Sequence, residues 1–151
     1  MKIIGIDPGI NATGYCIIEN GTANLTGTIR PRARPIYKKV DEICKKIETL
    51  LNENQPDYAV LEKVFYHKNI RSLIRSAELR GAIILTIFRA DIKMLEYTPA
   101  QIKLAITGNG RASKKQVRYV IERTLLTDSK KCSSHAIDAV AIAGTALRKL
   151  K

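Results

Sequence analysis

The sequence predicts an α/β fold in which helices flank a mixed five-stranded sheet with three antiparallel and two parallel strands. The nearly continuous apolar run at Ile3, Ile4 and Ile6 is typical of a strand that is buried on both faces. Asn20-Gly21 separates two strand-like segments and therefore predicts a hairpin. From Ile36 onward the apolar residues recur at helical spacing, which predicts a crossover helix ahead of the next strand.

The N-terminal half is expected to form an antiparallel meander and then a strand–helix–strand crossover. Strands at Thr13–Glu19 and residues 22–30 complete the meander with the first strand. A helix over Ile36–Asn54 follows, and Pro56-Asp57 ends it. A buried strand at Tyr58–Glu62 comes next, and a crossover of this length places it parallel to the first strand.

The C-terminal half is expected to be mainly helical. Its elements should be a helix at 69–90, a strand at 93–98, a short helix at 99–106, a glycine loop at 107–111, a helix opened by the Ser113–Gln116 capping box, and a closing helix at 135–149. The apolar side of the helix at 69–90 should carry Ile70, Leu73, Ile74, Ala77, Ile84, Leu85 and Phe88.

Length and charge indicate one basic domain. A chain of 151 residues is expected to form a single domain over 1–151. Lys and Arg number 26 against 14 acids, and the formal charge of +12 favours a polyanionic partner, nucleic acid first and an anionic membrane second. No long apolar segment or secretory signal is present, and three scattered cysteines lack metal-site spacing, which favours a reducing, cytoplasmic setting without a membrane span.

Two carboxylates close the two strands that are expected to be parallel. Taken alone, Asp7 before Pro8-Gly9 favours an ordinary turn over a metal ligand. Glu62, however, ends its own buried strand in the same way. Because parallel strands have their carboxyl ends at one edge of a sheet, Asp7 and Glu62 should reach the same rim.

A third acid interrupts the apolar closing helix. Asp138 lies inside the run at 136–144, and His135 precedes it by three residues on the same face. A structural ion pair or a helix cap would also explain Asp138, and His135 alone could be a surface residue. Three acids that converge on one rim repel one another, and Mg²⁺ or Mn²⁺ relieves that repulsion. On a basic protein this combination favours phosphodiester chemistry with two metal ions.

Several motifs together resemble the RuvC family of Holliday-junction resolvases. They are GIDPG with TGY within residues 5–15, QPDY with EKVF at 55–65, Lys68-Asn69, Arg80-Gly81, Gln101-Ile102-Lys103, GNGRASKKQV at 108–117 and HAIDAVAIA at 135–143. They occur in order over nearly the whole chain. The resemblance implies an RNase H-like fold, a homodimer and Mg²⁺-dependent, paired nicking of four-way DNA junctions that leaves 5′-phosphate and 3′-hydroxyl ends.

By that resemblance Asp7, Glu62 and Asp138 match the catalytic, metal-binding acids of the family. The fourth position, often Asp, is His135 here, as in some members. Imidazole suits Mn²⁺ better than Mg²⁺, so Mn²⁺ should substitute well for the two Mg²⁺ ions expected at each site.

Two aromatic residues and a basic cluster are candidate DNA contacts. Phe65 matches the base-contacting aromatic residue of the family, while stacking on a base or packing in the core stays open for its neighbour Tyr66. The basic candidates lie around the glycine loop and the following helix, and they are Lys103, Arg111, Lys114, Lys115 and Arg118. A solvated charged face is the alternative for such a run. Lys103 and Lys114 match family residues near the scissile phosphate.

The resemblance also implies partners and leaves rival functions. The helix at 69–90 would carry the homodimer face, and whether the RuvA–RuvB branch-migration complex is a further partner stays open. An actin-like ATPase would need a second nucleotide-binding lobe, for which 151 residues are too few. A non-catalytic junction-binding module and a phage or viral nuclease for branched DNA stay open as alternatives.

Overall fold

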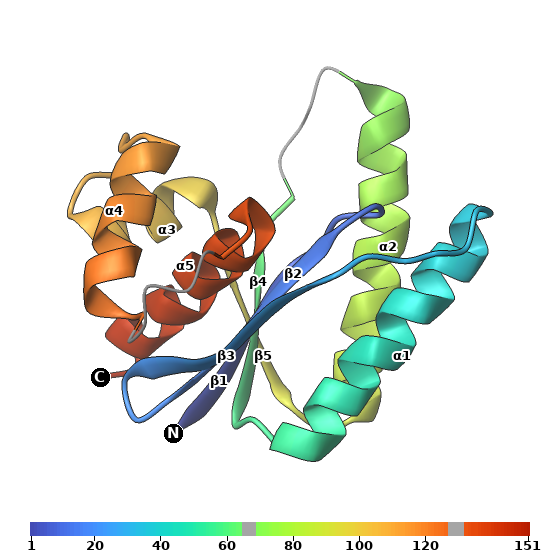
Figure 1. The fold of residues 1–151 in the computed structure, drawn as a ribbon, viewed down its shortest axis with the longest axis horizontal. Helices are drawn as coiled ribbons and strands as arrows, with labels where there is room; N and C mark the ends of the chain where they lie inside the picture. The colour runs from blue at the N-terminus through green and yellow to red at the C-terminus, as the bar shows by residue number, and fades with distance from the viewer. Residues whose placement is uncertain (65–68, 127–131) are drawn as a thin grey trace.

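The computed structural model describes residues 1–64, 69–126 and 132–151 (Figure 1). The strands are β1 (Lys2–Asp7), β2 (Thr13–Glu19), β3 (Thr22–Ile29), β4 (Tyr58–Glu62) and β5 (Lys93–Tyr97). The helices are α1 (Ile36–Asn54), α2 (Ile70–Arg89), α3 (Pro99–Thr107), α4 (Lys114–Thr124) and α5 (Ser134–Lys149). Within these described residues, no helix has the length and apolar character needed to cross a bilayer.

The five strands form one mixed sheet in the order β3-β2-β1-β4-β5. β1 pairs with β2 and β2 with β3 in antiparallel fashion, whereas β1 pairs with β4 and β4 with β5 in parallel. The predicted fold class is therefore confirmed, and every predicted element is present to within about two residues at each described end. β1 is central, so its carboxyl end is flanked by neighbours on both sides.

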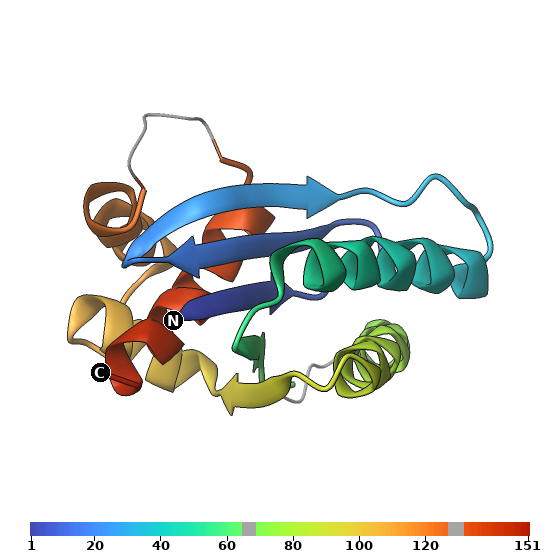
Figure 2. The ribbon, with the colours of Figure 1, turned by 90° about the horizontal axis from the view of Figure 1, so that it is seen from below.

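Helices cover both faces of the sheet. Figures 1 and 2 show α1 and α2 on one side and α3, α4 and α5 on the other. Alternate residues of β1 point to opposite faces, so Ile3 joins the apolar cluster under α5 while Ile4 and Ile6 join the cluster under α1 and α2. This two-sided burial explains why the sequence of β1 is almost continuously apolar.

Helix α5 packs unusually close to the sheet, and two glycines permit it. A Cβ atom on Gly5 would clash with the Ala139 carbonyl oxygen and would lie 2.8 Å from the Ala143 backbone nitrogen. A Cβ atom on Gly14 would clash with the carbonyl of His135. Since β1 and β2 lack side chains at these two points, the first half of α5 lies directly against the strands.

Helix α2 has a second apolar side that the sequence prediction did not list. Its core-facing residues are Leu79, Ile83 and Ile87. Of the predicted apolar side, Ile84 packs against the core, whereas Ile74 and Phe88 are 53% and 76% exposed. The exposed residues form a stripe along the outside of the helix, which also contains Ile70, Ala77, Gly81 and Leu85. Periodicity alone could not separate these two apolar faces because both follow the helical repeat.

Candidate active site

The sheet topology brings the first two candidate acids together. In the parallel pairing of β1 with β4, Ile6 lies opposite Leu61, so the next residues, Asp7 and Glu62, end neighbouring strands at the same edge. Both face a hollow of about 250 Å³ at this rim. The prediction that two acids distant in sequence share one rim is confirmed as geometry.

The start of α5 brings the other two candidates to the same edge. Its N-cap is Ser133, whose hydroxyl accepts a hydrogen bond from the backbone N–H of Ala136 at 3.1 Å. His135 and Asp138 therefore lie in the first turns of α5, above the end of β1. They are half-buried, whereas Ala136 and Ile137 between them are buried.

Asp7 makes a direct contact with His135. The Nδ1 atom of His135 lies 3.1 Å from Oδ2 of Asp7, and the Asp7 side chain is 18% exposed. Burial raises the pKa of Asp7, and the negative charge of Asp138 raises it further, while the hydrogen bond and charge of His135 oppose the rise. The net rise shows that His135 compensates only part of the cost of keeping Asp7 ionised.

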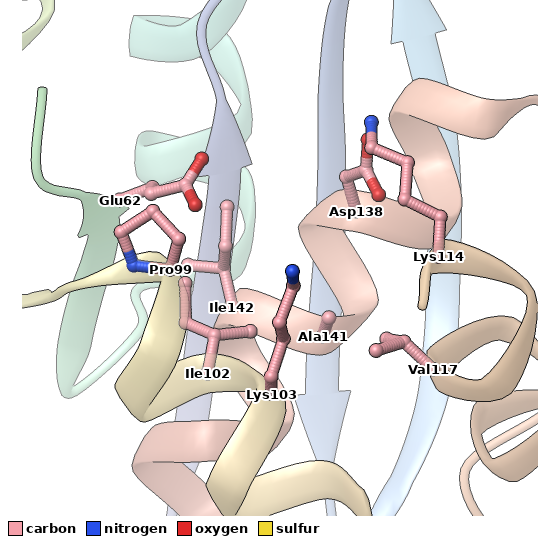
Figure 3. Close-up of a pocket in the computed structure, with 9 residues that line it drawn as sticks. All are labelled: Glu62, Pro99, Ile102, Lys103, Lys114, Val117, Asp138, Ala141 and Ile142. Carbon is pink, nitrogen blue, oxygen red and sulfur yellow. The ribbon is translucent and has the colours of Figure 1, made fainter. Parts of the chain in front are cut away.

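Glu62 occupies the junction of two hollows. It lines the hollow that Asp7 faces and a smaller one, of about 100 Å³, that Asp138 faces (Figure 3). Burial raises its pKa, and the charges of Asp7 and Asp138 add to the rise. Within the described chain, no group donates a hydrogen bond to the Glu62 carboxylate. A desolvated carboxylate in this position is suited to a cation.

Asp138 contacts a lysine. Lys114 Nζ lies 3.5 Å from Oδ2 of Asp138, and Figure 3 shows the two side chains together on the side of the hollow opposite Glu62. The Lys114 side chain is 88% exposed, so this ion pair is screened by water and contributes little stability. Asp138 is thus free to exchange this partner for another cation at little cost.

The donor set suits a hard divalent ion, although the side chains do not yet enclose one. Across residues 1–64, 69–126 and 132–151, no three His, Cys, Asp or Glu side chains form a group able to hold a metal ion as they lie. Asp7 is turned toward His135 and Asp138 toward Lys114. The charge of Asp138 nevertheless raises the pKa of both Asp7 and Glu62 across a shared rim. Carboxylate oxygens with one imidazole are the ligands Mg²⁺ and Mn²⁺ accept, so the residues fit the implied ions after side-chain rotation.

The predicted basic residues separate into two groups. Lys103 and Lys114 line the hollow between Glu62 and Asp138 (Figure 3). Lys115 instead lines a hollow beside the glycine loop, and Arg118 bonds Glu122 at 2.7 Å and the Cys132 carbonyl at 3.3 Å.

Three further candidates lie away from this hollow or outside the described chain. Arg111 is exposed on the glycine loop, where its backbone N–H donates to Asn109. The aromatic candidates Phe65 and Tyr66 lie outside the described residues.

One residue of the rim has no role in the sequence prediction. Arg80 of α2 lines the hollow shared by Asp7 and Glu62, and it forms an ion pair with Glu96 of β5. The sequence singles it out only as part of the Arg80-Gly81 motif of the resembling family. No periodicity or spacing rule could have paired this helical residue with an acid sixteen residues away on a strand.

Comparison with known proteins identifies the chain. Residues 3–146 match the family profile described as crossover junction endodeoxyribonuclease RuvC. The RuvC of Thermosipho melanesiensis is 38% identical over 95% of this chain and 94% of its own length. The RuvC of Aliarcobacter butzleri is 35% identical over 99% of this chain and 100% of its own length.

A solved structure agrees over the same extent. Thermus thermophilus RuvC in complex with a Holliday junction substrate superposes with a TM-score of 0.91, covering 99% of this chain and 94% of that one at 25% identity. The mixed sheet with acids at its rim is thus that of an RNase H-like nuclease. Within that class, the chain belongs to the RuvC family of crossover junction endodeoxyribonucleases.

Proposed function

We propose that this protein resolves four-way DNA junctions by hydrolysing one phosphodiester bond in each of two strands, leaving 5′-phosphate and 3′-hydroxyl ends. One observation carries the proposal beyond family membership. Asp7, Glu62 and Asp138 face two adjoining hollows at one edge of the sheet, in a chain with a net charge of +12. Asp7 and Glu62 have pKa values that burial and the neighbouring Asp138 charge raise, and such acids within a basic chain are expected where cations and phosphates are bound together.

The four polar residues of the rim would hold the metal. RuvC-family nucleases are metal-dependent. In this proposal Asp7, Glu62, Asp138 and His135 would together hold the divalent ions, two Mg²⁺ at each site. Bound there, divalent ions neutralise charge on the attacking and leaving oxygens.

The remaining residues of the site would position the DNA. Lys103 and Lys114 carry ammonium groups on the hollow between Glu62 and Asp138, where a backbone phosphate needs countercharge. Lys114 would leave Asp138 for the phosphate as DNA arrives, since their contact is loose and exposed. His135 would hold the Asp7 carboxylate in one orientation through the 3.1 Å contact. Phe65 would stack on a base at the crossover, as the family resemblance implies.

Paired nicking requires two sites, and α2 offers the surface that would join them. Ile70, Ile74, Ala77, Gly81, Ile84 and Phe88 follow one another at 4-3-4-3-4 spacing along this helix. All except Ile84 are exposed, and an apolar stripe of this kind is typical of a helix–helix interface. A two-fold dimer through α2 would present two active sites to two related strands.

The test is a cleavage assay on a mobile four-way junction, a linear duplex and a flap, with Mg²⁺ and Mn²⁺ titrated separately. Paired nicks on the junction alone are the expected result. We expect Mn²⁺ to support rates above those with Mg²⁺, because His135 replaces a carboxylate. Equal cutting of duplex and flap would contradict junction specificity. Binding without cutting in either metal would instead favour a non-catalytic junction-binding module.

The family resemblance extends the proposal to the cellular setting. We place the activity in the cytoplasm, where bacterial chromosomal DNA is recombined, with the RuvA–RuvB branch-migration complex as a partner. Co-purification of this chain with RuvA and RuvB on junction DNA, compared with junction DNA alone, would test that partnership.

A further inference from the structure

Arg80 connects three elements that meet at the active-site rim. It leaves the middle of α2 toward the sheet, and its side chain is only 16% exposed. The guanidinium NH2 group pairs with Glu96 of β5, and Nε lies 3.4 Å from the backbone carbonyl oxygen of Glu62 at the end of β4. One side chain thereby joins a helix to the ends of two neighbouring strands.

The Arg80 contact holds the backbone of Glu62, an acid that the proposed function requires. β4 ends at Glu62, and the last backbone bond holding this end to β5 is from Lys63 N–H to the Tyr97 carbonyl at 2.9 Å. The Glu62 carboxylate has no donor within the described residues, so its position depends on how firmly its backbone is held. Among the residues that the structure describes, Arg80 makes the one side-chain hydrogen bond to the Glu62 backbone.

The guanidinium is already engaged, which argues against direct contact with a substrate. Arg80 lines the same hollow as Asp7 and Glu62, but it faces Glu96, whose side chain is 30% exposed. A planar guanidinium can bond a carboxylate and a carbonyl at once in a fixed geometry, whereas a lysine ammonium offers a flexible point charge. The planar guanidinium of Arg80 therefore suits its two acceptors, the Glu96 carboxylate and the Glu62 carbonyl.

We infer that Arg80 is a positioning residue for Glu62: it fixes the end of β4 so that the carboxylate is held where a divalent ion binds. This inference rests on the proposed function, in which Glu62 is a metal ligand. Gly81, the next residue, lies on the exposed stripe of α2. The same helix that would join two protomers is therefore tied to the acid of each site.

The test compares Arg80→Ala, Arg80→Lys and Glu96→Gln with the control Arg89→Ala, an exposed arginine at the end of α2. Two quantities are measured: kcat on the mobile junction, and Mn²⁺ affinity without DNA by isothermal titration calorimetry. Arg80→Ala should lower both by about tenfold or more, as for other residues that orient a metal ligand. Arg80→Lys and Glu96→Gln should fall between Arg80→Ala and the unaltered protein. Arg89→Ala should match the unaltered protein.

Junction affinity measured in EDTA separates a positioning role from direct contact with DNA, and thermal denaturation shows whether each variant folds. Positioning predicts EDTA affinity within about twofold of the unaltered protein, since no DNA contact is lost. Unchanged Mn²⁺ affinity in Arg80→Ala would overturn the inference, as would a loss of EDTA affinity equal to the loss of activity. If Arg80→Ala fails to fold, the milder Glu96→Gln decides by the same readouts. If the unaltered protein cuts no junction, the proposed function fails, and Mn²⁺ calorimetry still tests the Arg80–Glu62 link.

Discussion

Helices α5 and α2 depart from the usual distribution of polar and apolar residues in opposite ways. In α5 every residue from Ala136 to Leu147 is buried except Asp138, so the exception is a charge inside an apolar element. In α2 the exceptions are apolar side chains in water, with Phe88 76% exposed. A half-buried charge in an otherwise apolar helix indicates a partner ion, and an exposed apolar stripe indicates a partner surface. These two exceptions are the features on which the proposed chemistry at α5 and the proposed assembly through α2 rest.

The largest effect should come from the rim beside α5. Asp7→Asn keeps the shape of the side chain and its contact with His135 but removes the charge that a divalent ion needs. Junction cleavage should fall at least about 10³-fold, equivalent to about 4 kcal/mol in activation free energy. Junction binding in EDTA should be retained. The control is Asp41→Asn on α1, where the carboxylate forms only an exposed pair with Lys45. Substantial residual cleavage would remove Asp7 from its central role.

The next effect should be on assembly through α2. Ile74→Glu and Phe88→Glu place charges on the exposed stripe, and the dimer dissociation constant should rise about 10²-fold or more. Circular dichroism should not change, because the two side chains contribute little to the core. Sedimentation velocity measures the oligomeric state, and Leu104→Glu on α3, 56% exposed in the protein, is the matched control. Identical sedimentation of all three variants would show that α2 is not the interface.

A smaller effect contrasts two glycines: Gly5, which packs against α5, and Gly81, which lies within α2. Gly5→Ala should lower the free energy of unfolding by about 1–3 kcal/mol, because its Cβ meets the α5 backbone. Gly81→Ala in α2 should raise it by about 0.5–1 kcal/mol, because apart from the adjoining backbone no atom of the described residues would lie within 4 Å of the new Cβ, and alanine favours a helix. Urea denaturation in an Ile74→Glu background measures both values without dimer effects. Similar values for the two variants would contradict the difference in packing.

The smallest effect concerns the free-energy cost of keeping the Glu62 carboxylate ionised in the folded protein. Burial raises the pKa of Glu62 above its ordinary value of 4.5, so folding favours the protonated form more than the unfolded chain does. The folded state therefore loses stability as pH rises from the ordinary pKa of Glu62 through its raised pKa. At neutral pH the protein carries the full free-energy cost of the buried, ionised carboxylate. Glu62→Gln should therefore stabilise the metal-free protein at pH 7.5, by about 1 kcal/mol or less, and not below pH 4. Thermal denaturation in EDTA measures this, with exposed Glu53→Gln as control. A destabilised Glu62→Gln at neutral pH would contradict the unfavourable burial.

Much of the fold could be predicted because local rules act at each boundary. Helix α4 begins where the Ser113 capping box predicts it, α3 begins at the proline that marks its first turn, and the Asn20-Gly21 hairpin joins β2 to β3. The rim position of Asp7 and Glu62 followed from one rule, that a helical crossover makes two strands parallel. Such signals lie within a few residues of what they determine.

The sequence by itself determined the fold class, the basic character and the shared edge of Asp7 and Glu62. Tertiary structure decided which stripe of α2 meets the core, which lysine approaches Asp138, and that Arg80 reaches Glu96 and the Glu62 carbonyl. The reason is physical. Periodicity reports that a face is apolar but not what covers it, and a pairing across three elements depends on distances that exist only after the sheet and helices have packed.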